Sequence, residues 1–495
     1  MPHNTKRSLF SGAIITVSMR WIDRLIGVVS TLLLARILVP DDFGIVAMAS
    51  LIVSFTNIIF DLGINIALIQ RKDPTPDYYN TAWTLRIMQA SLVALGLSLA
   101  APFAAEYYHE PRVVDVVRIM SLTIIIGAFE NVGIVNFQKD LDFVSDAKFI
   151  LFKRMAGFTA TIALTLLLQS YWGMILGALS GRLLGTLRSY WIHPMRPRFC
   201  LKEFGDIFSI SQWVLVKNIS QYIDRSAHIF VVGGLGQTSV TGGYTLAAEI
   251  SDMPGTDLLA PINRVLFPAF AKAKENLVEL TRLLMAAQGI QVMITVPACV
   301  GFVMTAHEFV PVALGEKWIF IIPFIQVLAL SNIIQSISSS ANYVLTVIGQ
   351  IRILAISSWV QIIVFGVGLL SFWQSLNPEL IAQLRLGSVI ATFGISYYML
   401  KRFIPQVSIA AMLRGIVRPI VGSAAMVCVL YGIGIMLTLP PAMMLAVKVG
   451  AGVVTYSLVV LVLWHVAGRP NGAESFFLTK FKLMPVRPLG QINVK

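Results

Sequence analysis

Long apolar runs, each bounded by polar residues or proline, recur along the whole chain. A membrane-spanning helix needs roughly 20 mainly apolar residues, so each run that reaches this length predicts one span. Glycines between residues 233 and 243 blur one break, which leaves counts of twelve or thirteen open beside fourteen. The pattern predicts an all-α polytopic membrane protein with spans at 12–35, 43–69, 80–104, 115–136, 147–168, 171–193, 207–234, 240–263, 283–305, 319–346, 353–373, 378–400, 416–438 and 444–466.

Composition agrees with this class. Hydrophobic residues make up 56% of the 495 residues and charged residues only 13%, which lies outside the range of soluble globular chains. The net charge of +13 would suggest a nucleic-acid partner in a soluble protein. Here we attribute it to membrane topology and to contact with anionic membrane lipids, and we expect no nucleic acid.

The loop charges predict the orientation. With the N-terminus inside, loops and tails on one side hold 24 of the 38 basic residues, whereas the opposite loops hold only Arg36, Arg112 and Lys317. Cytoplasmic loops carry the excess of lysine and arginine. We therefore expect both termini in the cytoplasm, which requires an even number of spans.

Eleven basic residues lie inside the predicted spans. Each charge near a helix centre costs about 2.5–3.5 kcal/mol on insertion scales, so such residues should face a bundle interior or a water-filled cavity. Those near helix ends could instead reach the interface with their long side chains, and we leave this open for Lys153, Arg154 and Lys448. The full set is Arg20, Arg24, Arg86, Arg118, Lys153, Arg154, Arg182, Lys217, Arg225, Arg385 and Lys448.

Polar residues in four spans recur at the three- and four-residue steps of one helix face. The first span carries Arg20, Asp23 and Arg24 in this way, and the seventh carries Lys217, Asp224 and Arg225. The second span contributes Asp61, and the eighth contributes Glu249 and Asp252. We expect the first, second, seventh and eighth spans to line a polar, net basic cavity.

One stripe is written twice, as Trp21-Ile22-Asp23-Arg24 and Tyr222-Ile223-Asp224-Arg225. The offset of 201 residues corresponds to six spans, and an even number makes the two halves parallel repeats with the transport path between them. This predicts an N-terminal lobe at 1–200, a C-terminal lobe at 201–405, two further spans within 406–467 and a basic cytoplasmic tail at 468–495.

Three blocks of residues carry a family resemblance: Phe43-Gly44 through Asp61-x-Gly63 to Gln70-Arg71-Lys72, the run Arg264–Phe270, and Phe309-Val310-Pro311 with Gly315-Glu316-Lys317-Trp318. Together they resemble the polysaccharide-transporter family of Wzx-type flippases, in particular the colanic-acid and exopolysaccharide type. The resemblance implies the MATE-like fold of the MOP exporter superfamily, in which two six-helix lobes form a V. It also implies a bacterial inner-membrane protein that moves an undecaprenyl-pyrophosphate-linked oligosaccharide, with a polysaccharide polymerase and export machinery as possible partners.

The basic residues suit such a substrate, because guanidinium groups form strong, often bidentate hydrogen bonds with phosphate oxygens. We predict that a cationic cavity made by Arg20, Arg24, Arg86, Arg182, Lys217 and Arg225 holds the anionic headgroup. The acidic residues would pair with these cations or bind a coupling ion; they are Asp23, Asp61, Glu130, Asp224, Glu249 and Asp252. For each residue, a purely structural ion pair is the competing interpretation.

Three other functions stay open. A cation-coupled drug exporter of the same fold needs an acidic cavity, and a lipid II flippase also carries an arginine pair on its first span. A membrane polymerase or ligase would need a catalytic group, but His109 and His307 stand alone. We therefore expect no enzyme and no cofactor. We also expect no metal, because Cys200, Cys299 and Cys428 have no ligand spacing. There is no glycine-rich nucleotide loop, so we do not expect ATP to drive transport within this chain.

Overall fold

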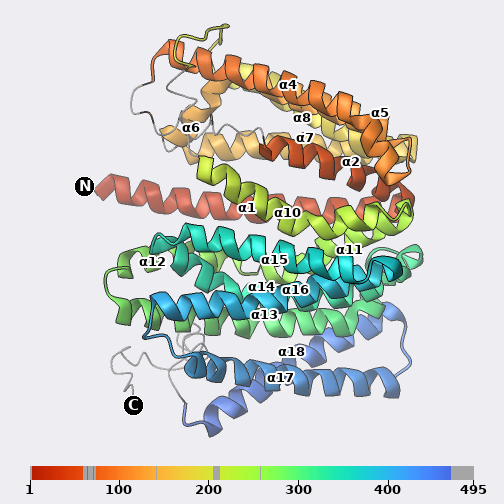
Figure 1. Ribbon diagram of the computed structural model, residues 1–495, viewed down its shortest axis with the longest axis vertical. Helices are drawn as coiled ribbons and strands as arrows, with labels where there is room; N and C mark the ends of the chain where they lie inside the picture. The colour runs from red at the N-terminus through yellow and green to blue at the C-terminus, as the bar shows by residue number, and fades with distance from the viewer. Residues whose placement is uncertain are drawn as a thin grey trace. The chain divides into compact units, whose positions relative to one another are not determined.

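The computed structural model describes residues 3–59, 64, 68, 71, 74–140, 142–204, 212–256 and 258–469. Within these ranges every regular element is a helix and none is a strand (Figure 1), so the all-α prediction is confirmed. The chain forms two compact units, Met1–Thr245 and Leu246–Lys495. Their boundary falls inside helix α11 (Thr238–Thr256), and the lobe limits at residues 200 and 405 stay a prediction.

The first unit holds long helices that follow the predicted spans in order. A 3₁₀ turn, η1 (Val132–Ile134), and the short helix α6 (Val135–Lys139) interrupt the connection after the fourth span. The spans themselves correspond to α1 (His3–Ile37), α2 (Pro40–Ile59), α4 (Pro76–Tyr108), α5 (Val113–Ala128), α7 (Phe143–Leu168), α8 (Tyr171–Ile192), α10 (Gln212–Gly233) and α11.

The second unit continues the series after α11. One helix, α12 (Ala260–Ala273), was not among the predicted spans, and two 3₁₀ turns, η2 (Glu316–Ile321) and η3 (Trp373–Ser375), join longer helices. The helices at predicted spans are α13 (Leu277–Ala313), α14 (Ile322–Val347), α15 (Ile351–Ser371), α16 (Pro378–Phe403), α17 (Ile409–Met436) and α18 (Pro441–Val466).

Nine of the described helices are long and apolar enough to cross a membrane. The five predicted spans outside this group are α1, α5, α8, α10 and α11. Helix α5 has only 16 residues, and the other four carry charged residues in their sequences, such as Arg20 in α1 and Arg182 in α8. The count of fourteen crossings therefore stays a prediction, although a helix occupies each predicted position.

Helix starts coincide with capping residues. The Thr75 hydroxyl accepts a hydrogen bond from the Tyr78 amide at 3.2 Å, one residue before Pro76 opens α4. The side chains of Asp142 and Asn377 cap α7 and α16 in the same way. A side-chain oxygen at this position satisfies one of the amide groups that a helix start leaves without a partner. These caps fix where the chain turns from loop into span.

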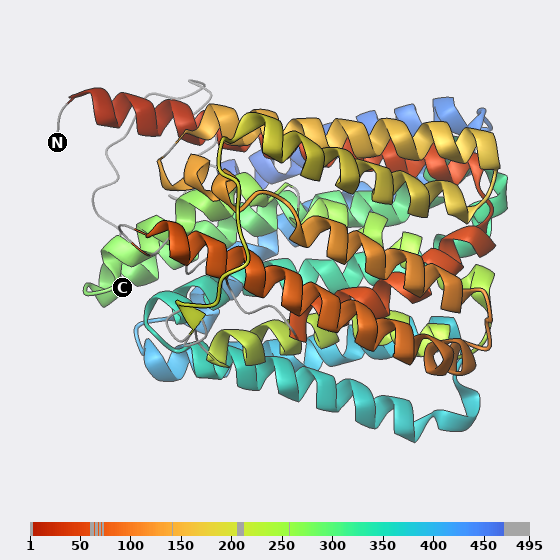
Figure 2. The ribbon, with the colours of Figure 1, turned by 90° about the horizontal axis from the view of Figure 1, so that it is seen from above.

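Helices α7 and α8 lie side by side along their length, as the yellow pair in Figure 2 shows. The contact runs through glycines at every fourth residue of α8. A Cβ added at Gly173, Gly177 or Gly181 would lie 2.3–2.4 Å from a backbone carbon of Thr165, Thr161 or Gly157. Small residues at this spacing let two membrane helices approach closely, so this stripe sets the position of α8 beside α7.

The starts of α2 and α11 make reciprocal contacts within the first unit. A Cβ added at Gly44 would lie 1.9 Å from the Thr238 carbonyl oxygen, and one added at Gly242 would lie 2.1 Å from the Pro40 carbonyl oxygen. Each glycine stands four residues after the first residue of its own helix. In this mutual arrangement Gly44 of α2 and Gly242 of α11 occupy equivalent positions.

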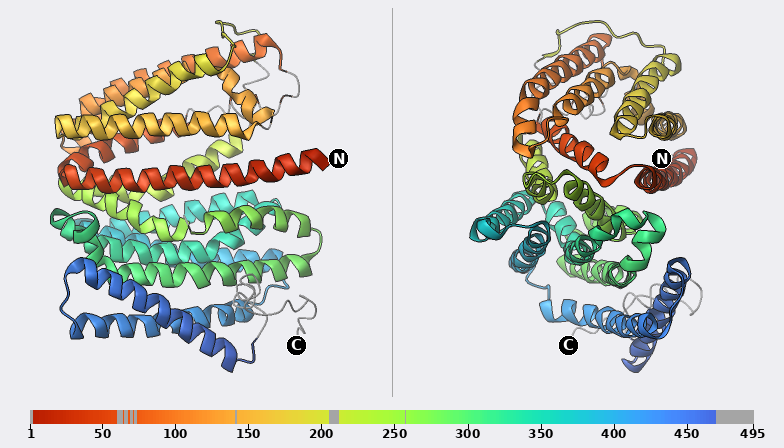
Figure 3. Two further views of the ribbon diagram at one scale, coloured as in Figure 1. Left: turned by 180° about the vertical axis from the view of Figure 1, so that it is seen from behind. Right: turned by 90° about the vertical axis from the view of Figure 1, so that its right-hand side faces the viewer.

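The second unit buries its own core between α13, α14 and α16, with residues such as Leu284, Val344 and Leu400. Helices α17 and α18, drawn in blue in Figure 3, pair with each other and pack on α13. Lys448 of α18 forms an ion pair with Glu308 of α13 at 2.5 Å, and both side chains are largely buried. The Lys448 side chain thus has an internal partner.

Pro268 lies inside α12. Trp318 is fully buried in η2. Of the three cysteines, Cys299 is buried, Cys200 is half-buried and Cys428 is exposed.

Candidate functional site

Two arginines meet at Gly127, near the end of α5. The Arg86 guanidinium in α4 donates a hydrogen bond to the Gly127 carbonyl at 3.0 Å. A Cβ added at Gly127 would lie 2.1 Å from Nε and Nη2 of Arg182, so the Arg182 guanidinium of α8 rests directly on this glycine. The absence of a side chain at position 127 makes room for the second cation.

The end of α5 explains why polar groups gather there. The last four carbonyls of a helix have no partner within the helix. Thr186 donates a hydrogen bond to the Ile126 carbonyl at 3.0 Å, and Tyr190 donates one to the Phe129 carbonyl at 2.8 Å. Together with Arg86, these α8 side chains satisfy the helix end and hold α8 against it.

Glu130 follows directly and binds a third cation. Its carboxylate forms an ion pair with Lys153 of α7 at 2.8 Å, where the Glu130 side chain is 14% exposed and that of Lys153 is 26% exposed. The lysine stem lies against Gly185, whose added Cβ would be 2.6 Å from Lys153 Cγ. Glu130 and Arg182 also act electrostatically on Arg86. Two basic groups, Lys153 and Arg86, therefore interact with this carboxylate.

The next residue of α7 extends this arrangement to α1. Arg154 Nε lies 3.0 Å from the Asp23 carboxylate, and a Cβ added at Gly27 would lie 2.8 Å from Arg154 Nη2. Arg20 is exposed and Arg24 half-buried within one turn of Asp23. Asp23 thus neutralises a cation of another helix, and Arg154 does not merely reach for the interface.

These residues form one feature of the first unit, which we call the basic belt: Arg20, Arg24, Arg86, Lys153, Arg154 and Arg182, with Asp23 and Glu130. At a rise of 1.5 Å per residue, Lys153 and Arg182 lie about 15 Å from the starts of α7 and α8, near mid-helix. The belt holds six cations and two carboxylates, and charged groups inside a membrane are costly unless they face partners or water. Such a belt is suited to bind an anion.

Other predicted site residues of this unit lie on α10, which packs against α2. Tyr222 of α10 donates a hydrogen bond to the Leu51 carbonyl of α2 at 2.5 Å and stacks on Phe55. Next to it, Arg225 is exposed and Asp224 half-buried, and both have interaction partners. The Lys217 side chain and Asp61 lie outside the described residues.

Glu249 and Asp252 belong to the second unit, whereas the basic belt belongs to the first. Glu249 is exposed and Asp252 half-buried in α11. Both have partners, and the described residues contain no group of three potential metal ligands.

Lys153 and Arg154 were missing from the predicted site. Two adjacent charges within an apolar run could have indicated a functional site. The sequence alone instead left open that both side chains lie near a helix end and reach the membrane interface.

A polar cluster joins the starts of α2 and α11 to the α4–α5 loop. Arg112 forms ion pairs with Asp41 at 2.9 Å and Glu110 at 2.6 Å, and Thr238 donates a hydrogen bond to Glu110 at 3.2 Å. The hydrogen bond from the Arg112 guanidinium holds the pKa of Glu110 below its ordinary value of 4.5. This cluster secures the loop side of the helices that carry the glycine contacts.

Comparison with known families decides the identity of the fold. A family model described as "Polysaccharide biosynthesis protein" matches residues 33–323, more than half of the chain. The chain belongs to this polysaccharide biosynthesis family. Relatives include the teichuronic acid biosynthesis protein TuaB of Bacillus subtilis (strain 168), at 25% identity over 92% of this chain and 95% of TuaB. The lipopolysaccharide biosynthesis protein WzxC of Escherichia coli (strain K12) is 26% identical over 63% of this chain and 65% of WzxC.

Solved structures show the same architecture. The lipid II flippase MurJ in an inward closed conformation superposes with a TM-score of 0.74 at 12% identity, over 92% of this chain and all of that one. A MATE-family transporter of the MOP superfamily, in an inward-facing conformation, gives 0.54 at 14% identity over 80% of this chain and all of that one. The predicted MATE-like fold of a multi-pass membrane protein is confirmed. The expectation of a transporter rather than an enzyme is confirmed as well.

Proposed function

We propose that the protein is a flippase that moves an undecaprenyl-pyrophosphate-linked oligosaccharide repeat unit across a bacterial inner membrane. The observation that carries this proposal is the basic belt in a member of the polysaccharide biosynthesis family. Its fold is that of a lipid II flippase, whose name describes transport of a lipid-linked precursor. Both termini would lie in the cytoplasm, as the loop charges predict.

The belt supplies what an anionic headgroup needs when it leaves water. A pyrophosphate carries several charged oxygens, and each can accept a hydrogen bond from an arginine. Arg86 and Arg182 converge from two helices on Gly127, so one phosphate could contact both. Further cations would bind the headgroup along the rest of its path across the membrane: Arg20, Arg24, Arg225 and Lys217. Asp23 and Glu130 hold Arg154 and Lys153 in place and reduce repulsion when no substrate is bound.

The acidic residues have a separate proposed role. Asp61, Asp224, Glu249 and Asp252 would pair with cations during transport or bind a coupling ion. A lipid II substrate is the second candidate, and the fold similarity to MurJ supports it. The relatives TuaB, WzxC and the succinoglycan biosynthesis transport protein ExoT of Rhizobium meliloti (strain 1021) bear the names of other glycans, which favours an exopolysaccharide, capsule or lipopolysaccharide precursor.

A deletion experiment tests the proposal. Cells that lack the gene should accumulate complete lipid-linked repeat units, measured by mass spectrometry of extracted lipids, and should lose the polymer. Reintroduced protein should restore both, while Arg24→Gln and Arg225→Gln variants at equal membrane abundance should not. An unchanged lipid-linked pool with normal polymer yield in the deletion strain would reject a flippase function for these glycans.

A further inference from the structure

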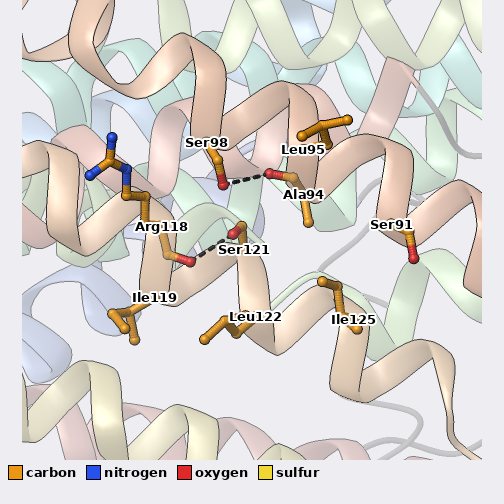
Figure 4. Close-up of a pocket in the computed structure, with 9 residues that line it drawn as sticks. All are labelled: Ser91, Ala94, Leu95, Ser98, Arg118, Ile119, Ser121, Leu122 and Ile125. Atoms are coloured by element: carbon orange, nitrogen blue, oxygen red, sulfur yellow. Dashed lines mark hydrogen bonds between the residues drawn. The ribbon is translucent and has the colours of Figure 1, made fainter.

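A groove between α4 and α5 contains an arginine that the transport site does not use. The groove has a volume of about 420 Å³, within the range of sites that hold small ligands. Figure 4 shows Arg118 and Ser98 toward one end, Ser91 at the other, and Leu95 and Leu122 between them. Its walls come from these two helices alone.

Within the part of the chain that the structure describes, no carboxylate pairs with Arg118, whereas Lys153 and Arg154 of the basic belt each pair with one. Among the described residues its guanidinium has no ion pair and no hydrogen bond, and Asp115, one turn earlier, does not pair with it. Arg86, Lys153 and Arg154 all have protein partners. An exposed arginine on a helix that lies in a membrane needs either water or an anion beside it.

The surroundings of Arg118 face lipid. Leu95 is 59% exposed and Leu99, one turn further along α4, is 67% exposed. Exposed leucines in a spanning helix are expected to contact acyl chains, since a water-filled path would carry polar residues. The groove therefore opens to the hydrocarbon region, and an acyl chain can lie along Leu95 and Leu122.

The depth of Arg118 matches the headgroup boundary. Helix α4 has 33 residues and is about 50 Å long at 1.5 Å per residue, so it exceeds a hydrocarbon core of about 30 Å by roughly 10 Å at each end. Ser98 stands ten residues before the end of α4, about 15 Å from the helix end and hence about 5 Å inside the core. A flexible arginine at this level reaches the phosphate layer.

Two serines shape the polar end of the groove. The Ser98 hydroxyl donates a hydrogen bond to the Ala94 carbonyl at 2.8 Å, and the Ser121 hydroxyl donates one to the Arg118 carbonyl at 2.6 Å (Figure 4). Because each hydroxyl proton is already donated to a backbone carbonyl, the two hydroxyl oxygens are left to act as hydrogen-bond acceptors. They can accept hydrogen bonds from a hydroxyl-bearing headgroup while Arg118 binds its phosphate.

We propose that this groove is a binding site for an anionic phospholipid of the membrane, with Arg118 on the phosphate and Leu95 and Leu122 along an acyl chain. The predicted topology puts the site in the periplasmic leaflet. The occupant is a resident lipid and not the transported one, because no residue of the basic belt lines the groove. The proposal does not rest on the flippase function.

Lipid binding to the purified, delipidated full-length protein tests the proposal. Native mass spectrometry would measure one-to-one adducts with phosphatidylglycerol and with phosphatidylcholine of the same acyl chains. Wild type should bind phosphatidylglycerol more tightly. Arg118→Gln should weaken that binding about tenfold, equivalent to about 1.4 kcal/mol, and leave phosphatidylcholine unaffected. Arg118 is exposed, so this change leaves folding intact.

A matched pair of variants tests the groove itself. Leu95→Trp should fill the groove and weaken both lipids, whereas Leu99→Trp on the same exposed face should change neither. Equal affinity of wild type for the two lipids, or no effect of Arg118→Gln, would overturn the proposal. So would tighter binding of a polyprenyl phosphate that displaces phosphatidylglycerol, because the site would then belong to the carrier lipid. These lipid-binding results do not depend on transport, so they would stand even if the protein failed to flip a lipid-linked oligosaccharide.

Discussion

Substitution of Gly127 by alanine would move a proposed substrate-binding arginine without removing it. The new Cβ would lie 2.1 Å from Arg182 Nε and Nη2, whereas ordinary contacts begin at 3.4 Å. The guanidinium must therefore shift by more than about 1 Å. Because it is the far end of a flexible side chain, the fold can yield there, and alanine in a helix is favoured over glycine by up to about 1 kcal/mol. We expect near-normal stability.

The functional cost follows from what Arg182 would bind. A hydrogen bond to a charged group contributes about 1.5–3 kcal/mol, and 1.4 kcal/mol corresponds to a factor of ten. Arg182→Gln should therefore slow transport roughly 10- to 100-fold at limiting substrate, and Gly127→Ala should slow it by a smaller factor in the same direction. Gly96→Ala is the matched control, because nothing lies within 4 Å of its added Cβ.

The assay is the initial rate of flipping in proteoliposomes at limiting lipid-linked oligosaccharide, with thermal unfolding of each variant measured in detergent. A Gly127→Ala variant as fast as Gly96→Ala and wild type would refute the assignment of Arg182 to the substrate path. A Gly127→Ala variant that is slow because it unfolds early would instead contradict the stability argument.

Further predictions concern stability and topology. Glu130→Gln leaves Lys153 without its partner and should destabilise the protein by about 1–3 kcal/mol, with partial recovery in the double variant with Lys153→Gln, as measured by thermal unfolding. Gly177→Val places a side chain against the Thr161 backbone and should abolish folded protein in size-exclusion chromatography, unlike Gly96→Val. Since the pKa of Glu110 is lowered, its stabilisation should be present above pH 4.5 and be lost as the pH falls through the lowered value; Glu110→Gln should lack that acid limb. A cysteine in loop 105–114 should react with an impermeant thiol reagent from the periplasm, and one in 70–79 should not.

Much of the fold could be predicted because apolar length alone determines a spanning helix. Each predicted span overlaps a described helix, and capping residues such as Thr75 mark the starts. Helix α12 was missed because its first residues continue the apolar run of α11. Pro268 lies within α12, although proline removes one backbone hydrogen bond from a helix interior.

The site could be predicted only in part. Periodicity puts Arg20 and Arg24 on one face, and a charge in a span indicates function or pairing. Which charges meet depends on how the helices pack. Glycines set this packing here, because the Arg182 guanidinium lies against Gly127 and the Lys153 side chain lies against Gly185. The pairs of Asp23 with Arg154 and of Glu130 with Lys153 join residues more than twenty positions apart, so no local pattern encodes them.

The most direct test of the account is transport by the purified protein. Lipid-linked oligosaccharide from the deletion strain would be reconstituted with the protein into sealed vesicles, and an added glycosidase would digest only the glycan in the outer leaflet. The account predicts nearly complete digestion with wild type and about half with the Arg24→Gln and Arg225→Gln double variant. Half digestion in wild-type vesicles, equal to protein-free vesicles, would contradict it.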